Sequence, residues 1–480
     1  MVHQIPIPQA KYELLNAVIP KHSRCSRLVC LTLPLLVIGF LFLIGGIWID
    51  VQGTLARNHQ VVFREKSGTF RDAKTFAWTR RARMYAESAK ENQNVDRNST
   101  LDAMPNISPH SPSDPLVVCY YTLPRFLNAS GDLRPSDLDP RICTHIIVGF
   151  ASVVNSRLSP GPFPSIYTEI SALKKQFPKL KTMISAGGIN EIDSGFPEMV
   201  KTHANRKIFI NSILNITRMY NLDGLDVDWE FPAWLGGKER ERIYFVQLLQ
   251  ELRRAFDKSG RELILSVAVA APAAIIDESY NVPQIAEHVD FINLMSYDYH
   301  YYVWYLPITG LNAPLYANPL EMGYSATLNV NYSAFYWISK GMPREKIVMG
   351  IPTYGHSFQL DNEQNHGIMA PAKGFGSLGE MGFTNYREVC EFIRKGGSKV
   401  FDEDSRTPYA YGKHDWVSFD DQVSVMEKVE WIKLNGFRGA MILSLNTDDW
   451  NGTCHDNETF PLTRVVANNL LSSRELPLDN

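Results

Sequence analysis

The chain carries almost no net charge. Among its 480 residues, 48 are lysine or arginine and 51 are aspartate or glutamate, which leaves a formal net charge of −3. Proteins that bind nucleic acids usually carry a basic surplus or patch, so this balance argues against a nucleic-acid partner. Hydrophobic residues make up 45 % of the chain, enough for a large core. This length suits two to four compact units, or one large α/β barrel with additional segments.

Cysteine is scarce, with six residues in the whole chain. Cys25 and Cys30 border an apolar segment, where lipidation is one option. The remaining four are enough for two disulfides if the domain lies in an oxidising compartment. These four are Cys119, Cys143, Cys390 and Cys454.

One long segment lacks charge altogether. Residues 28–49 form a run of 22 residues without a charged side chain, a length that suits a membrane-spanning helix. A cleaved signal peptide is the alternative, but its apolar core would be shorter and a small-residue cleavage site would follow. Here the run ends in Trp48 and Ile49, and Asp50 follows, which is not a small-residue site. We therefore expect one retained N-terminal membrane anchor over 28–49.

The flanks of this segment predict its orientation. Lys21, Arg24 and Arg27 precede it, whereas Asp50 follows, so residues 1–27 are expected to be a cytosolic tail. Seven Asn-x-Ser/Thr triplets lie beyond the segment and none lies before it. Together these features predict a single-pass type II protein whose C-terminal part is lumenal or extracellular and glycosylated. The expected glycosylation sites are Asn98, Asn106, Asn128, Asn215, Asn331, Asn451 and Asn457.

The region after the anchor divides into a stem and a folded domain. Residues 50–114 lack sustained hydrophobic periodicity and end in a stretch rich in serine and proline, which is typical of a linker. From residue 115 onward, short apolar runs alternate with segments of helical pattern. The runs are Val117–Tyr121, His145–Phe150, Thr182–Ser185, Gly224–Glu230, Leu263–Ala268, Phe291–Met295, Ile347–Ile351 and Gly439–Ser444.

Eight buried runs separated by helices predict a parallel (β/α)8 TIM barrel over residues 115–472. Helices are expected, for example, at Glu239–Ser259 and Asp421–Leu434. The interval 356–420 is too long and too rich in glycine and polar residues for a single helix, and we interpret it as a small α+β insertion. Residues 473–480 form a short C-terminal tail.

The most informative run is Asp223–Glu230. Within it, Asp226, Asp228 and Glu230 alternate with apolar residues, and this period of two predicts a strand with three carboxyls on one face. Crowded carboxyls raise the pKa of at least one of them, and a carboxyl with a raised pKa can act as a general acid near neutral pH. Catalytic groups of such barrels lie at the C-terminal ends of the strands. Glu230 is expected to end this strand.

A metal site is the main alternative for the acidic run. Such a site would need histidine or further oxygen ligands nearby, and the run contains none. We expect neither a metal nor a cofactor.

These residues resemble a known family. Asp223–Glu230 is similar to the catalytic signature of glycoside hydrolase family 18, the chitinases and chitinase-like lectins. The resemblance extends over nearly all of the barrel and implies the disulfides Cys119–Cys143 and Cys390–Cys454, as in animal members. An anchor ahead of the domain resembles some nematode chitinase-like proteins. The motifs that carry the resemblance, in chain order, are Cys119–Thr122, Asp137–Pro140, Cys143–His145, Ser185–Gly188, Met295–Asp298, Gly350–Gly355 and Gly439–Met441.

The resemblance implies a substrate-assisted retaining mechanism on chitin or another glycan that contains N-acetylglucosamine. In it Glu230 protonates the glycosidic oxygen, Asp228 orients the acetamido group of the substrate, and Asp226 shares a proton with Asp228. Tyr297 donates to the acetamido oxygen. For two further pocket residues, Phe150 and Met295, plain core packing is the alternative. The residues implied to line the pocket are Tyr120, Phe150, Met295, Asp298 and Tyr354.

The chain departs from the family at its sugar-stacking positions. Leu443 stands where active members carry a tryptophan beneath the sugar, Ile189 replaces a second tryptophan, and His356 replaces a pocket arginine. The tryptophan common after the first-strand motif falls near Leu123 and Pro124. Four aromatic residues are candidates to rebuild a platform, namely Trp234, Tyr302, Trp304 and Tyr305.

Two functions follow from this pattern. The intact Glu230 favours a hydrolase that cuts β-1,4-linked N-acetylglucosamine. The missing tryptophans favour a membrane-anchored lectin that binds glycan with little or no turnover. We expect the hydrolase.

Overall fold

The computed structural model describes residues 114–124, 132–188, 195–454 and 457–471. The predicted tail and anchor, all but the last residue of the stem, and the C-terminal tail lie outside these residues. So do three of the expected glycosylation sites and one of the departures from the family pattern, namely Asn98, Asn106, Asn128 and Ile189. In the described ranges, no helix combines the length and the apolar character needed to cross a membrane.

Within the described residues, eight parallel strands close into the predicted TIM barrel. The hydrogen-bonded order runs β1-β15-β8-β7-β6-β5-β4-β2, and the pairing of β1 with β2 closes the ring. A short strand, β3 (Arg157–Ser159), pairs antiparallel with the C-terminal end of β2. The barrel strands are β1 (Leu116–Thr122), β2 (His145–Val154), β4 (Lys181–Gly187), β5 (Gly224–Asp228), β6 (Ile264–Ala270), β7 (Phe291–Met295), β8 (Ile347–Pro352) and β15 (Gly439–Leu443).

Each expected apolar run corresponds to one barrel strand, because strands of a parallel barrel are buried on both faces. The prediction for the acidic strand is wrong at its end. β5 ends at Asp228, opposite the last residue of β4, Gly187. Among the described residues, neither β4 nor β6 pairs with β5 beyond Asp228, so Glu230 lies past the strand. Only Asp226 and Asp228 share a strand face.

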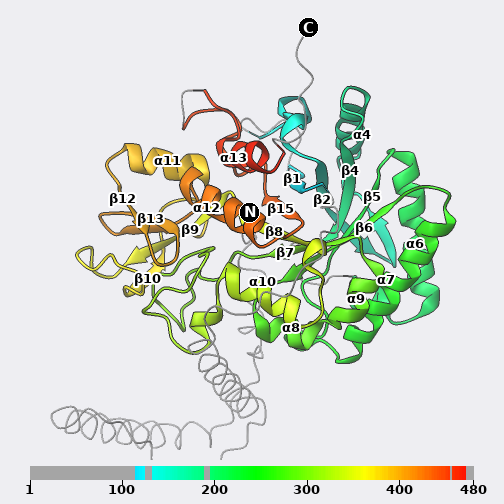
Figure 1. Cartoon of the computed structure of the whole chain (residues 1–480), viewed down its shortest axis with the longest axis horizontal. Coiled ribbons are helices and arrows are strands. Elements are labelled where there is room, and N and C mark those ends of the chain that lie inside the picture. The colour runs from blue at the N-terminus through cyan, green and yellow to red at the C-terminus, as the bar shows by residue number, and fades with distance from the viewer. Residues whose placement is uncertain (1–113, 125–131, 189–194, 455–456, 472–480) are drawn as a thin grey trace, which may run out of the picture. The chain divides into compact units, whose positions relative to one another are not determined.

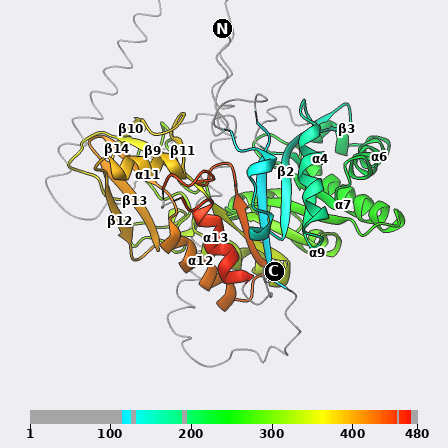
Figure 2. The same cartoon turned by 90° about the horizontal axis from the view of Figure 1, so that it is seen from above.

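Helices surround the barrel, as Figures 1 and 2 show. The expected helix at 239–259 is α7 (Arg240–Lys258), whose buried residues recur at helical spacing toward the strands. The expected helix at 421–434 is α12 (Gln422–Leu434), and the Asp421 carboxylate caps its N-terminus by accepting from the backbone N–H of Ser424 at 2.9 Å. The other helices of the outer layer are α4 (Ser165–Ala172), α5 (Phe196–Val200), α6 (His203–Met219), α8 (Ala273–Ser279), α9 (Val282–His288), α10 (Val330–Ser339) and α13 (Pro461–Leu470).

The predicted α+β insertion follows β8 and forms its own antiparallel sheet. The order is β10-β9-β14-β13-β12, with β11 paired to β9. Figures 1 and 2 show this sheet (yellow to orange) on the side of the barrel away from α6 and α7. Its elements are β9 (Tyr354–Leu360), β10 (Ala372–Phe375), β11 (Phe383–Asn385), α11 (Tyr386–Arg394), β12 (Ser398–Asp402), β13 (Thr407–Gly412) and β14 (Asp415–Ser418).

Both expected disulfides are present. Cys119 on β1 is bonded to Cys143 just before β2, with Cα atoms 6.0 Å apart. Cys390 on α11 is bonded to Cys454 in the segment after β15, with Cα atoms 5.7 Å apart. The second bond therefore ties the insertion to the C-terminal part of the barrel.

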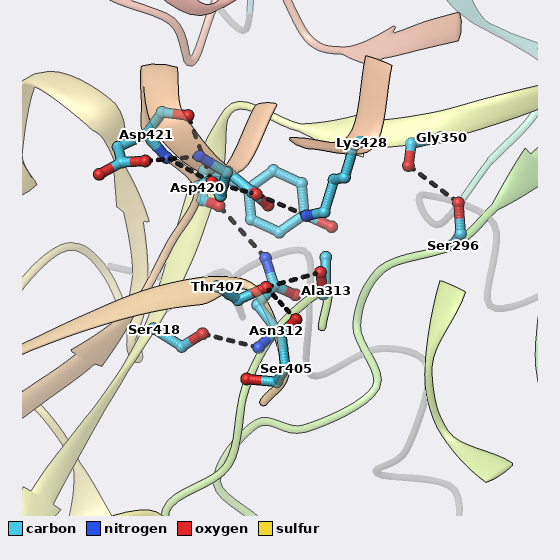
Figure 3. Close-up of polar contacts among 12 residues, drawn as sticks. Ser296, Asn312, Ala313, Gly350, Ser405, Thr407, Ser418, Asp420, Asp421 and Lys428 are labelled. Atoms are coloured by element: carbon cyan, nitrogen blue, oxygen red, sulfur yellow. Dashed lines mark hydrogen bonds and ion pairs between the residues drawn. The ribbon is translucent and has the colours of Figure 1, made fainter. Parts of the chain in front are cut away.

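A buried ion pair also joins the insertion to the barrel. The Lys428 ammonium of α12 binds the carboxylate of Asp420, which follows β14, and both residues are 1 % exposed. The Ser424 hydroxyl donates to the same carboxylate at 2.7 Å. Figure 3 shows the Lys428 side chain reaching Asp420. Burial raises the pKa of Asp420 and lowers the pKa of Lys428, so each charge depends on its partner.

Candidate functional site

The interior of the barrel is an apolar cluster that contains most of the predicted pocket residues. Alternate residues of the strands point inward. They form a cluster that includes Tyr120 of β1, Met295 of β7 and Met441 of β15. Tyr297 and Tyr354 belong to the same cluster, and Phe150 and Leu443 pack against it while remaining half-buried. The structure therefore brings these residues together around the C-terminal ends of the strands.

Asp226 lies deep in this interior and is fully buried. One oxygen, Oδ2, accepts hydrogen bonds from the hydroxyls of Tyr120 at 2.7 Å and Ser185 at 2.8 Å. The other, Oδ1, accepts from the Ser266 hydroxyl at 2.7 Å and from Asn293 Nδ2 at 3.1 Å. Burial raises the pKa of Asp226, and these hydrogen bonds act in the opposite direction. The expected raised carboxyl pKa is present at Asp226, but its main cause there is burial rather than crowding by the other carboxyls.

Three of these donors were not assigned from the sequence. Ser185 lies within a family motif, but Ser266 and Asn293 stand alone in apolar strands, β6 and β7. All three are fully buried. A polar residue at an inward position of a buried strand is the available signal, because such a group needs a hydrogen-bond partner.

Asp228 and Glu230 follow along the same segment toward the barrel rim. Asp228 is 4 % exposed and ends β5, whereas Glu230 is half-buried just beyond it. The end of β4 approaches the Asp228 backbone closely, and only glycine fits there. The φ of Gly187 is +111°, and a Cβ atom on it would lie 2.1 Å from the Asp228 carbonyl oxygen. The backbone N–H of Gly188 donates to the same oxygen at 2.8 Å.

Two buried tyrosines face the acidic residues. Burial raises the pKa of Tyr297 first, and the charges of Asp228 and Asp298 raise it further. Burial and the Asp298 charge likewise raise the pKa of Tyr354. Both phenols therefore stay protonated across the physiological range and can donate a hydrogen bond.

The Asp298 carboxylate contacts both Tyr354 and His356. Its Oδ1 accepts from the Tyr354 hydroxyl at 2.6 Å and lies 2.8 Å from Nε2 of His356. The His356 ring is almost fully buried and contacts the rings of Tyr354 and Phe383 edge-on. The histidine that replaces the family's arginine therefore contacts Asp298.

Comparison with known proteins identifies the family. Residues 116–448 match the model of Glycosyl hydrolases family 18. The chain belongs to this family. It is 37 % identical to chitotriosidase-1 of Mus musculus, over 75 % of this chain and 79 % of that protein. It is 39 % identical to chitinase-3-like protein 2 of Homo sapiens, over 74 % of this chain and 92 % of that protein.

Solved structures of family 18 proteins include both catalysts and binders. The Group IV chitinase of Ostrinia furnacalis is 34 % identical, with a TM-score of 0.70 over 75 % of this chain and all of that chain. Human YKL-39, a pseudo-chitinase with retained chitooligosaccharide-binding properties, is 38 % identical, with a TM-score of 0.70 over 74 % of this chain and 99 % of that chain. Family 18 membership therefore leaves both functions open for this chain.

The structure shows what surrounds Leu443, which replaces a family tryptophan, and the two pocket residues Phe150 and Met295. Leu443 is the last residue of β15 and packs in the cluster that contains Tyr120. Phe150 stacks on Tyr120 with ring centroids 5.9 Å apart, so it packs in the core while part of its surface stays exposed. Met295 is 7 % exposed and serves mainly as core. Position 443 itself therefore presents an aliphatic side chain where the family's tryptophan would present a ring.

The four candidate aromatic residues have different surroundings. Trp304 and Tyr305 are 70 % and 58 % exposed and contact each other edge-to-face at 5.8 Å. Tyr302 packs against Phe375 of the insertion with centroids 5.2 Å apart. Trp234 is half-buried. Trp304 and Tyr305 are the pair with a large open surface for a sugar ring.

Proposed function

We propose that this family 18 chain is a retaining hydrolase of glycans that contain β-1,4-linked N-acetylglucosamine. The observation that carries the proposal is the complete acidic series, in which Asp226 and Asp228 share a strand face and Glu230 lies just beyond them. Tyr297 lies among them with its phenol protonated. Supporting evidence comes from the 37 % identity to a chitotriosidase.

The proposed mechanism uses the substrate's own acetamido group as nucleophile. Glu230 gives its proton to the glycosidic oxygen as the bond to the anomeric carbon breaks, and the acetamido oxygen bonds to that carbon to form an oxazolinium ion. Asp228 orients the acetamido nitrogen and stabilises its developing charge, while Tyr297 donates to the acetamido oxygen. Water, deprotonated by Glu230, then opens the oxazolinium ion with net retention.

The part proposed for Asp226 is electrostatic and indirect. Its two oxygens accept four hydrogen bonds from Tyr120, Ser185, Ser266 and Asn293, so it remains in one place beneath Asp228. A second carboxyl held there favours protonation of one member of the pair, which lets the pair share a proton during the reaction.

A glycan-binding protein with little or no turnover is the second candidate. Leu443 favours it, because an aliphatic side chain lacks the flat face on which a sugar ring stacks. An aromatic face contributes about 1–3 kcal/mol to a ring contact, by analogy with base stacking. The similarity to human YKL-39, which retains chitooligosaccharide binding, also supports this candidate.

One experiment separates the two candidates. The full-length chain is incubated with N-acetylchitooligosaccharides of two to six units, and both products and binding are measured. Release of shorter oligosaccharides supports the hydrolase. Saturable binding without products identifies the lectin, and an absence of both overturns the proposal.

Substitution of Leu443 by tryptophan tests how far this position limits activity. The new ring should supply the missing face and raise kcat/KM on chitooligosaccharides roughly fivefold, which corresponds to about 1 kcal/mol of transition-state binding. Tryptophan is much larger than leucine, and overpacking costs about 1–3 kcal/mol of stability, so thermal melting is measured alongside. Leu443→Met, of similar volume to leucine but without a ring, is the matched control. A well-folded tryptophan variant that performs no better than the methionine variant would show that this position does not limit the site.

We further propose that the chain is a single-pass type II membrane protein, with residues 1–27 in the cytosol and the barrel lumenal or extracellular. The uncharged segment 28–49 and the positions of the Asn-x-Ser/Thr triplets support this topology. The domain should resist protease added to intact microsomes and become sensitive once detergent is present. Degradation of the barrel without detergent would contradict the topology.

A further inference from the structure

Asn312 is a fully buried residue that touches two pocket residues at once. It lies in the segment between β7 and α10 and is 0 % exposed. Its side-chain Oδ1 accepts from the backbone N–H of Asp298 at 2.9 Å, and its Nδ2 donates to the backbone carbonyl of Tyr354 at 3.2 Å. One amide group therefore holds the main chains of the two residues whose side chains meet at 2.6 Å.

Asp298 needs such support because of its backbone. Its φ is +58°, in the left-handed region that a residue with a Cβ atom adopts at a cost. It also lies three residues beyond the end of β7, where no strand ladder holds the chain. The bond from its N–H to Asn312, together with the bonds of its carboxylate to Tyr354 and His356, holds it in this conformation.

The main chain of Asn312 is in turn held by the insertion. Its N–H donates to the hydroxyl of Ser418, the last residue of β14, at 2.7 Å, and its carbonyl accepts from the N–H of Tyr299 at 3.0 Å. Ala313 accepts from the Thr407 hydroxyl of β13 at 3.4 Å. Figure 3 shows Asn312 and Ala313 lying against Ser418, Ser405 and Thr407 of the insertion.

We propose that Asn312 is a positioning residue through which the insertion sheet holds Asp298 and Tyr354 in place, with Ser418 as the contact on the insertion side. The inference rests on the proposed function, in which Asp298 and Tyr354 line the sugar pocket. The insertion then has a part in the reaction through Ser418, which is fully buried at the end of β14. Asn312 suits this position because its amide presents an acceptor to Asp298 and a donor to Tyr354, whereas aspartate would set an oxygen against the Tyr354 carbonyl.

The test removes the Ser418 hydroxyl in the full-length chain. Ser418→Ala leaves the Asn312 N–H buried without an acceptor, which costs about 1–3 kcal/mol and should loosen the segment. Ser357→Ala is the matched control, because Ser357 is buried on β9 of the same sheet and its hydroxyl donates to the Leu378 carbonyl at 2.8 Å. Ser418→Cys, which keeps the size but is a weak acceptor, serves if the alanine variant folds poorly.

Amide hydrogen exchange at Asp298 and Tyr299 is the direct readout, since both N–H groups donate to Asn312. Exchange there should become roughly fivefold faster or more in Ser418→Ala, in line with the loss of a buried hydrogen bond, and stay unchanged in Ser357→Ala. Binding of chitotriose should weaken by a similar factor in Ser418→Ala only. Equal exchange rates in the two alanine variants would overturn the positioning role.

The binding measurement distinguishes a failure of the proposed function from a failure of the positioning role of Asn312. If the unmodified chain neither binds nor cuts chitooligosaccharides, the proposed function fails, while hydrogen exchange still decides whether Asn312 holds Asp298 through Ser418. If exchange accelerates and ligand binding by Ser418→Ala matches that of Ser357→Ala, the insertion holds the loop without affecting the sugar pocket, and the positioning role for the reaction is overturned.

Discussion

Replacement of Glu230 by glutamine should remove nearly all turnover of chitooligosaccharides. Glutamine has almost the same shape as glutamate but cannot give up a proton to the glycosidic oxygen, and general acid catalysis contributes about 10²–10⁴-fold to rate. Glu230 is half-buried and lies two residues after Asp228. It is close enough to Tyr297 for its charge to help raise the pKa of that phenol. Because the change is nearly isosteric, affinity for chitotriose should remain close to that of the unmodified chain.

The measurement pairs steady-state kinetics with calorimetric binding. Glu239→Gln provides the same chemical change at an exposed position nine residues along the chain, and it should leave both kcat and affinity unaltered. If Glu230→Gln retains turnover within a few-fold of the unmodified chain, Glu230 is not the proton donor. Loss of binding together with turnover would instead indicate that the substitution disturbs the pocket.

Replacement of Lys428 by methionine should destabilise the domain by about 3–5 kcal/mol, the usual cost of removing one partner of a buried pair. The Asp420 carboxylate would then remain fully buried without its cation, while the Ser424 hydroxyl still donates to it. Methionine closely matches the shape of the lysine stem, so the effect reports on charge rather than on a cavity. Urea unfolding followed by fluorescence measures the difference.

The pH dependence of this variant follows from the Asp420 carboxyl. Burial raises the pKa of Asp420, and removal of the Lys428 charge takes away the largest interaction that lowers it, leaving the Ser424 hydrogen bond as the weaker one. A carboxyl whose folded pKa lies above its unfolded value of about 3.9 contributes full stability below that pH and loses it as pH rises through the folded value. The Lys428→Met variant should therefore lose stability as pH rises above about 4.

A second substitution checks this cause. Asp420→Asn, added to Lys428→Met, removes the buried charge while leaving an oxygen that accepts from Ser424. The double variant should regain most of the lost stability at neutral pH and no longer lose stability above pH 4 through this group. If the double variant is as unstable as the single one, Lys428 and Asp420 stabilise the contact between the insertion and α12 by packing rather than by charge neutralisation.

Local patterns along the chain predicted the architecture well. The eight apolar runs correspond to the eight barrel strands, because burial on both faces requires an unbroken apolar segment that can be recognised without knowledge of its neighbours. The length and composition of residues 356–420 indicate an insertion, which the structure places between β8 and α12. The period of two placed Asp226 and Asp228 on one strand face, and family resemblance implied the two disulfides.

Contacts between distant segments decided the rest of the site. Where β5 ends depends on its pairing with both β4 and β6, which stops at Asp228, so Glu230 lies beyond the ladder. Asp226 is surrounded by donors from β1, β4, β6 and β7, and its raised pKa comes from burial, which is a property of the whole barrel.

Asn312 is the clearest example of a residue whose role is visible only in the tertiary structure. In the sequence it is an ordinary polar residue in a long segment. In the fold its amide reaches Asp298 and Tyr354, 14 and 42 positions away, and its N–H reaches Ser418, 106 positions away. Strand formation depends on near neighbours and is visible in local periodicity, whereas hydrogen bonds across a closed barrel and its insertion depend on how the chain returns to itself, and that is decided by tertiary packing.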